Sequence, residues 1–152
     1  MQTSFTEKQL ENKENKTSET ILRKCVHCGM CNATCPTYGI NGDELEGPRG
    51  RIYLIKDMLE NNKPANKKIA QHIDSCLSCY SCMTTCPSGV NYMHLIDHGR
   101  NYVEETYKRP FIERTFRNIL SFVLPRPKVF LTLAILTKFI KPLSFLMPKF
   151  LK

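Results

Sequence analysis

The sequence lacks the motifs that usually mark a catalytic or nucleotide-binding site. It has no phosphate-binding loop, no Rossmann glycine fingerprint and no Ser-His-Asp set. It also has no run of alternating apolar and polar residues, the pattern that predicts a half-buried β-strand. These absences argue against a self-contained flavin or nicotinamide enzyme, and they favour an all-helical protein.

The sequence also predicts no targeting segment and no membrane-spanning helix. Residues 1–20 are polar and contain no apolar core, so we expect no secretory signal and a location in the reducing cytoplasm. The longest uncharged apolar run, VFLTLAILT, has 9 residues, whereas roughly 20 are needed to span a bilayer. Acidic residues are scarce in one part only. Residues 111–152 hold 8 Lys and Arg against the single acid Glu113, whereas residues 1–110 hold 14 basic and 13 acidic residues.

All eight cysteines lie in two runs of identical spacing, Cys-x2-Cys-x2-Cys-x3-Cys-Pro. The runs consist of Cys25, Cys28, Cys31 and Cys35, and of Cys76, Cys79, Cys82 and Cys86. Cysteines at such spacing in a reducing compartment indicate metal binding more often than disulfides. Zinc usually takes two ligands from each of two knuckles, whereas three thiolates from one turn and a distant fourth suit an iron–sulfur cubane. Zinc and disulfides are the alternatives.

The spacing matches the bacterial iron–sulfur pattern, in which the fourth cysteine of each run ligates the other cluster. We therefore predict two [4Fe–4S] clusters, the first held by Cys25, Cys28, Cys31 and Cys86, and the second by Cys76, Cys79, Cys82 and Cys35. Pro36 and Pro87 disfavour a helical conformation at the preceding cysteine, which lets its thiolate point to the opposite cluster. Gly29 permits close backbone approach. Clusters held by crossing runs lie close together, which predicts an electron carrier without a catalytic site of its own.

Helical periodicity divides the chain into three parts. Residues 1–17 are predicted to form a flexible polar arm, residues 18–110 the dicluster domain, and residues 111–152 a basic, apolar tail cut into short helices by prolines. Within the domain we expect helices from near Ser18 to Cys25, over 48–60, over 65–75 and from Val90 to Glu105.

Several polar residues near the cysteine runs are secondary candidates. His27 is expected to be a solvated loop residue rather than a proton shuttle. The remaining histidines are expected on helix surfaces or in packing: His72, His94 and His98. Arg49 and Arg51 lie at a helix start, where the macrodipole disfavours cations. They either balance the negative charge of a thiolate-ligated cluster or form a solvated face.

The cysteine spacing alone fits many families. The segment GDELEGPRGRIYLIK, and TTCPSGVNY at the end of the second run, narrow the choice of family. With them, residues 20–110 closely resemble the iron–sulfur subunits of bacterial glycolate oxidases. The resemblance implies an α-helical ferredoxin domain, flavin-binding partner subunits that carry FAD, and electron flow from glycolate oxidation through both clusters to a respiratory acceptor. The two cysteine-rich C-terminal domains of that family are absent from this sequence, so acceptor-side chemistry is not carried over.

Other functions remain open. The same clusters would serve a related lactate, glycerol 3-phosphate or heterodisulfide-reductase-like complex, a stand-alone dicluster ferredoxin, or an iron–sulfur regulator that uses the basic tail on DNA. The tail, residues 111–152, is expected to dock on a partner or domain, or to lie on the anionic inner face of the cell membrane. Nucleic-acid binding is disfavoured because no groove-reading motif accompanies the charge.

Overall fold

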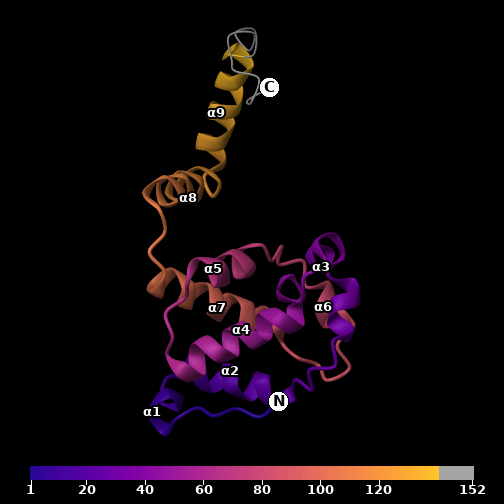
Figure 1. Ribbon diagram of the computed structural model, residues 1–152. Coiled ribbons are helices and arrows are strands. Elements are labelled where there is room, and N and C mark those ends of the chain that lie inside the picture. The colour runs from indigo at the N-terminus through magenta and orange to yellow at the C-terminus, as the bar shows by residue number, and fades with distance from the viewer. Residues whose placement is uncertain (141–152) are drawn as a thin grey trace. The chain divides into compact units, whose positions relative to one another are not determined.

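The protein is helical throughout the part that the structure describes. The computed structural model describes residues 1–140, with side chains to residue 136. Every regular element in this range is a helix (Figure 1), which confirms the predicted all-α class. The chain divides into two compact units, Met1–Lys108 and Arg109–Lys152.

Four longer helices build the core of the first unit: α2 (Lys13–Lys24), α4 (Pro48–Asn61), α5 (Lys67–Asp74) and α7 (Tyr92–Thr106). Helix α7 contacts the other three. The buried side chains between them recur at helical spacing, and include Leu22, Ile55, Met58, Ile73, Leu95, Ile96 and Val103. Gly99 brings α7 close to α4, since a Cβ at this position would lie 2.8 Å from Cγ1 of Ile55.

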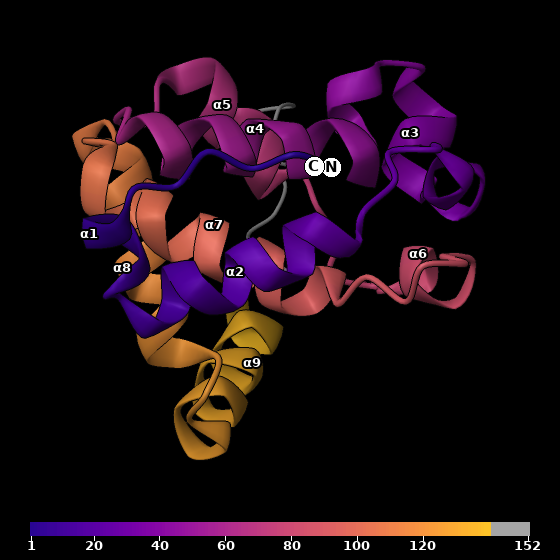
Figure 2. The same ribbon diagram turned by 90° about the horizontal axis from the view of Figure 1, so that it is seen from below.

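Short elements gather at one side of these helices. They are η1 (Met30–Thr34), α3 (Pro36–Asn41), η2 (Glu44–Glu46) and α6 (Ser81–Thr84). Figure 1 and Figure 2 both show α3 and α6 on the same side of the long helices, and α6 contacts η1 directly. Both cysteine runs therefore meet in one region, although they are far apart in the sequence.

The expected helices of the domain are present, and their ends follow from local chemistry. Pro48 occupies the first turn of α4, where its missing N–H costs nothing, and Asn62 ends the helix in the left-handed conformation with φ 47°. Helix α5 is capped by the Asn66 side chain, and α7 by Asn91. The predictions over 48–60, 65–75 and 90–105 agree with these bounds within the usual uncertainty of helix ends.

The N-terminal segment differs from the flexible polar arm that we expected over residues 1–17. It contains α1 (Glu7–Leu10), and α2 begins at Lys13 rather than near Ser18. Its polar side chains are used as caps: Thr6 and Gln9 form a reciprocal capping box on α1, and Asn12 caps α2. Gln9 is buried, and its Nε2 donates to the carbonyl oxygens of Leu59 and Glu60, both at 2.9 Å. A polar composition therefore did not mean a free segment.

Gly50 allows α4 to pack against η2, and we predict a large effect of enlarging it. A Cβ at residue 50 would lie 2.2 Å from the carbonyl oxygen of Glu44, a backbone atom that cannot rotate away. Gly50→Ala should therefore cost about 1–3 kcal/mol as an overpacked contact, measured as a lower denaturant midpoint of the cluster-loaded protein. Gly39→Ala is the matched control, because nothing lies within 4 Å of its Cβ position. Equal midpoints for the two variants would contradict this contact.

The described part of the second unit contains α8 (Phe111–Val123) and α9 (Pro127–Ile140). Pro125 lies between them and Pro127 begins α9, as expected for a tail interrupted by prolines, whereas Pro142 and Pro148 lie outside the described residues. Among the described helices, none is by itself long and apolar enough to cross a membrane. The pair α8 and Pro127–Leu136 meets the length and composition criteria together, with a bend of 109°.

Candidate metal centre

Two cavities collect the cysteines in crossed sets. The first cavity is lined by Cys25, Cys28, Cys31 and Cys86, together with Cys82. The second cavity is lined by Cys35, Cys76, Cys79 and Cys82. Three cysteines of one run thus share each cavity with the fourth cysteine of the other run. Pro48, Cys82 and Tyr92 line both cavities, so the two spaces adjoin each other.

The two runs share an unusual backbone pattern. His27 and Ser78, at equivalent positions, have φ values of 58° and 51°. Gly29 and Tyr80, also at equivalent positions, have φ values of 84° and 55°. Left-handed residues thus flank the second cysteine of each run, and a bulky non-glycine residue such as Tyr80 rarely adopts this conformation. Backbone strain of this kind is typical of functional sites. The left-handed residues curve the backbone of each run around its cavity.

The proline after the first run acts as expected. Cys35 is extended, with φ −86° and ψ 116°, and Pro36 begins α3 at its first position. The chain therefore changes direction at Cys35. After the second run Pro87 enters a turn instead of a helix, and the backbone N–H of Val90 donates to the Cys86 sulfur at 3.5 Å.

The cysteines differ in how readily they ionise. Burial, followed by repulsion from neighbouring cysteines, raises the pKa of Cys31 to about 11 and that of Cys82 to about 12. At the rim, hydrogen bonds from Ser81 lower the pKa of Cys79. Metal coordination requires thiolates, and the buried thiolates are unfavourable without a compensating cation. We therefore expect cluster assembly and folding of this region to be coupled.

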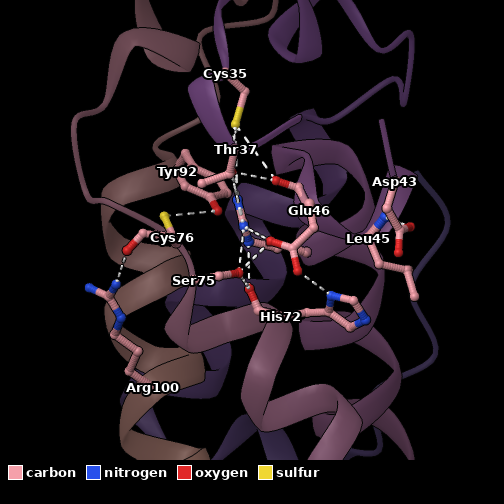
Figure 3. Close-up of polar contacts among 11 residues, drawn as sticks. Cys35, Thr37, Asp43, Leu45, Glu46, His72, Ser75, Cys76, Tyr92 and Arg100 are labelled. Carbon is pink, nitrogen blue, oxygen red and sulfur yellow. Dashed lines mark hydrogen bonds and ion pairs between the residues drawn. The ribbon is translucent and has the colours of Figure 1, made fainter. Parts of the chain in front are cut away.

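A buried polar network lies beside Cys35, and Arg51 is its centre. The Arg51 side chain is 0% exposed, and its Nη2 pairs with Oε2 of Glu46 at 2.8 Å. Its Nε donates to the His72 carbonyl at 2.6 Å, and Nη2 donates to the Ser75 hydroxyl at 3.0 Å. Figure 3 shows the Glu46 carboxyl between Ser75 and His72, with Thr37 and Cys35 beyond it. Arg51 therefore does not belong to a solvated helix face, which was one of the two alternatives for this residue.

The network holds its carboxylate in the charged form. Burial alone would raise the pKa of Glu46, but hydrogen bonds from Ser75 and His72 and the charge of Arg51 outweigh it, so the pKa lies below its ordinary value. His72 Nδ1 lies 2.7 Å from Oε1 of Glu46, while its Nε2 is buried and has no hydrogen-bond partner among the described residues. His72 is therefore a packed network residue and not a surface one.

The other secondary candidates take different places. Arg49 is partly exposed and pairs with Glu44, and its guanidinium lies against the backbone of Gly29 in the first run. His27 lines the first cavity and stacks on Tyr53 with ring centroids 6.2 Å apart, so it is not a freely solvated loop residue. His98 hydrogen-bonds the Ser18 hydroxyl at 2.7 Å, as expected for a packing residue.

Sequence reasoning did not find the partners of Arg51. Thr37, Glu46 and Ser75 come from three separate segments, and no spacing rule links them. The placement of an arginine in the first turn of a helix was the available signal. The buried Tyr92 of α7 is another such residue, and its hydroxyl donates to the Cys76 sulfur at 3.6 Å.

The donor set fits iron–sulfur clusters. All eight cysteines are free of disulfides. Within residues 1–140, no three His, Cys, Asp or Glu side chains converge closely enough to hold a single metal ion. The thiols instead surround two adjoining cavities, as ligands at the corners of a cubane would.

Comparison with known proteins agrees with this class. Residues 21–90 match the family model of the 4Fe-4S dicluster domain. The chain is 55% identical over 130 residues to the glycolate oxidase iron-sulfur subunit of Escherichia coli, covering 86% of this chain and 32% of that protein. It is 33% identical over 117 residues to the probable glycolate oxidase iron-sulfur subunit of Bacillus subtilis, covering 74% and 26%. The resemblance inferred from the sequence is confirmed.

A more distant relative matches less than half of this chain. The chain is 29% identical over 76 residues to the succinate dehydrogenase iron-sulfur subunit of Paracoccus denitrificans, covering 46% of this chain and 29% of that protein. The chain thus spans about a third or less of the length of these three relatives. No solved structure matches it.

Proposed function

We propose that this chain is the electron-transfer iron–sulfur component of a flavin-dependent complex that oxidises glycolate to glyoxylate. The observation that carries the proposal is the pair of adjoining cavities, each lined by three cysteines of one run and the fourth of the other. A [4Fe–4S] cluster bound in each cavity supplies reversible one-electron storage. The similarity to the E. coli protein supports glycolate as the electron source.

In this proposal the chain binds and insulates two redox groups, and it performs no acid–base chemistry. The crossed cysteines Cys25, Cys28, Cys31 and Cys86 hold the first cluster, and Cys76, Cys79, Cys82 and Cys35 hold the second. Oxidation of the hydroxy acid takes place on partner subunits that carry FAD, on the cytoplasmic side of the cell membrane. Electrons pass through both clusters to a respiratory acceptor.

Anaerobic purification of the tagged full chain from its native cells tests this function. We expect flavin-containing subunits to co-elute, and we expect glycolate to reduce the clusters in the purified complex. Reduction by lactate but not by glycolate would assign a related complex instead. A chain that elutes without flavin and accepts electrons from several unrelated enzymes would be a stand-alone ferredoxin, and the proposal would then be wrong.

The second unit is proposed to attach the chain to its complex. Several apolar side chains of α8 are exposed, among them Ile112, Phe116 and Ile119, and Arg114 and Arg117 lie on the same helix. Such an amphipathic helix buries its apolar face on a partner or in the surface of an anionic membrane.

Removal of residues 111–152 is predicted to leave the iron content unchanged, because the cysteines all lie in the first unit. Recovery of the flavin subunits should fall strongly, and the single variant Phe116→Glu should reproduce most of that fall. Thr115→Ser, on the same helix, is the matched control. Retention of the flavin subunits combined with loss from the membrane fraction would assign the tail to the lipid surface. Unchanged recovery in both assays would contradict an attachment role.

A further inference from the structure

We propose that Arg51 makes the second cluster, the one ligated through Cys35, the higher-potential member of the pair. The inference rests on the proposed iron–sulfur function and assigns a role to a residue that does not itself ligate. Nη1 of Arg51 lies 4.0 Å from the Cys35 sulfur. The Thr37 hydroxyl lies 3.2 Å from the same sulfur, accepts from both Nη atoms at 3.2 and 3.1 Å, and donates to the Glu46 carbonyl at 2.7 Å. Arg51 thus reaches the ligand directly, and the Thr37 hydroxyl that it orients lies against the same sulfur.

The guanidinium is held in one orientation. Nε donates to the His72 carbonyl, and Nη2 donates to Glu46 and Ser75. Nη2 also reaches Thr37, whereas Nη1 faces both Thr37 and the Cys35 sulfur. A planar fork fixed at this many points loses little further freedom when the sulfur becomes a cluster ligand.

Among the described residues, no buried guanidinium contacts a cysteine sulfur of the first set, and the ammonium group of Met1 donates to the carbonyl of Cys25 rather than to its sulfur. The residue 51 positions after Arg51 is Tyr102, so the repeat carries no second guanidinium there. The donor to Cys86, the crossing ligand of the first set, is the neutral backbone N–H of Val90. Arg49 lies near the first run, but its side chain is 35% exposed and its partner Glu44 is 42% exposed, so water screens its charge.

This asymmetry sets a direction for electron transfer. Reduction adds a negative charge, and hydrogen bonds to ligand sulfurs stabilise the added charge and raise the reduction potential. Donors that carry charge are about twice as strong as neutral ones, and burial strengthens them further. One electron is therefore favoured at the cluster beside Arg51. The first cluster is oxidised by one electron, the second is reduced by one, and no proton or bond is exchanged.

Potentiometric titration of the cluster-loaded full chain, followed by electron paramagnetic resonance, tests the inference. The double variant Arg51→Met with Glu46→Gln removes both buried charges together and leaves no unpaired carboxylate. We expect the double variant to lower the equilibrium constant for one-electron reduction of one cluster at least tenfold. This corresponds to a fall of about 59 mV in the midpoint potential of that cluster. The single variant Arg51→Lys keeps the positive charge, so its midpoint potential should lie between those of the wild-type chain and the double variant. The matched exposed pair, Arg49→Met with Glu44→Gln, should shift neither cluster by this amount.

The affected cluster is identified by Cys35→Ser, which should change the same resonance signal. Unchanged midpoints with both clusters present would overturn the inference and leave the proposed function standing, and so would a shift confined to the other cluster. If the double variant does not retain its second cluster, the midpoint potential is measured in Thr37→Val instead. This variant removes the hydroxyl that contacts both Arg51 and Cys35, and it keeps the guanidinium. A smaller fall in the same signal supports the role of Arg51, and no fall refutes it. If the wild-type chain, purified under anaerobic conditions, contained no iron and no sulfide, the proposed function itself would be refuted.

Discussion

Replacing Cys35 with alanine is expected to halve the iron and sulfide content of anaerobically prepared protein. Cys35 lines the second cavity with Cys76, Cys79 and Cys82, and it lies outside the lining of the first. Alanine leaves one corner of a cubane without a ligand, whereas the hydroxyl of serine is still able to bind iron. The cluster held by the first set should therefore survive, and chemical analysis of iron and sulfide measures the loss.

The reciprocal variant and a neighbouring control make the Cys35 result specific. Cys86→Ala should also halve the iron content, but the surviving resonance signal should be the one that Cys35→Ala removes. Val26→Ala alters an exposed side chain inside the first run and should change neither content nor signal. Full iron retention in Cys35→Ala, or loss of both clusters, would contradict separate cluster sites.

Replacing Glu46 with alanine should be among the most damaging changes outside the cysteines. Arg51 is completely buried and the Glu46 side chain is 8% exposed. Removing one partner of a buried ion pair leaves an uncompensated charge and costs about 3–5 kcal/mol. His72 and Ser75 would also lose their shared acceptor. We expect a much lower denaturant midpoint for the cluster-loaded protein, measured by helical circular dichroism under anaerobic conditions.

Glu44→Ala provides a control with the same chemistry in a different environment. Glu44 lies in the same short helix η2 and also pairs with an arginine five positions later, but both side chains are partly exposed. An ion pair that water screens contributes little, so the midpoint should change far less than in Glu46→Ala. Similar losses in the two variants would show that the buried pair has no special structural weight.

The cysteine pattern predicted more of this protein than any other feature. The equal spacing of the two runs predicted two clusters, and Pro36 predicted the extended backbone at Cys35, because proline acts on its neighbour through local sterics. The helices over 48–60 and 90–105 were also predictable, since their apolar residues recur on one face and their caps are local.

The parts that escaped prediction depend on contacts between distant segments. Gln9 caps the end of α4 across 50 residues of sequence, so the polar composition of residues 1–17 suggested a free arm. The capping box of Thr6 and Gln9 was readable in the sequence and signalled a helix start. Arg51 and Glu46 meet Ser75 only because α4 and α5 pack together. No pattern in the sequence predicts that the side chains of Arg51 and Glu46 are buried.

The left-handed conformation of Tyr80 is a further case. Gly29 at the equivalent position indicated a special backbone, whereas tyrosine gave the opposite indication because it rarely adopts positive φ. The constraint comes from the repeat itself: both runs wind around a cavity in the same way. Comparing the runs position by position, with an offset of 51 residues, would have transferred the expectation from Gly29 to Tyr80.

Iron analysis of two double-cysteine variants tests crossed ligation most directly. Cys35→Ala combined with Cys79→Ala removes two ligands of the second set only, whereas Cys35→Ala combined with Cys28→Ala removes one ligand from each set. Crossed ligation predicts that the first double variant keeps half of the iron and sulfide and that the second keeps almost none. The reverse result, with half of the iron retained only when Cys28 and Cys35 are both removed, would mean that each run ligates its own cluster.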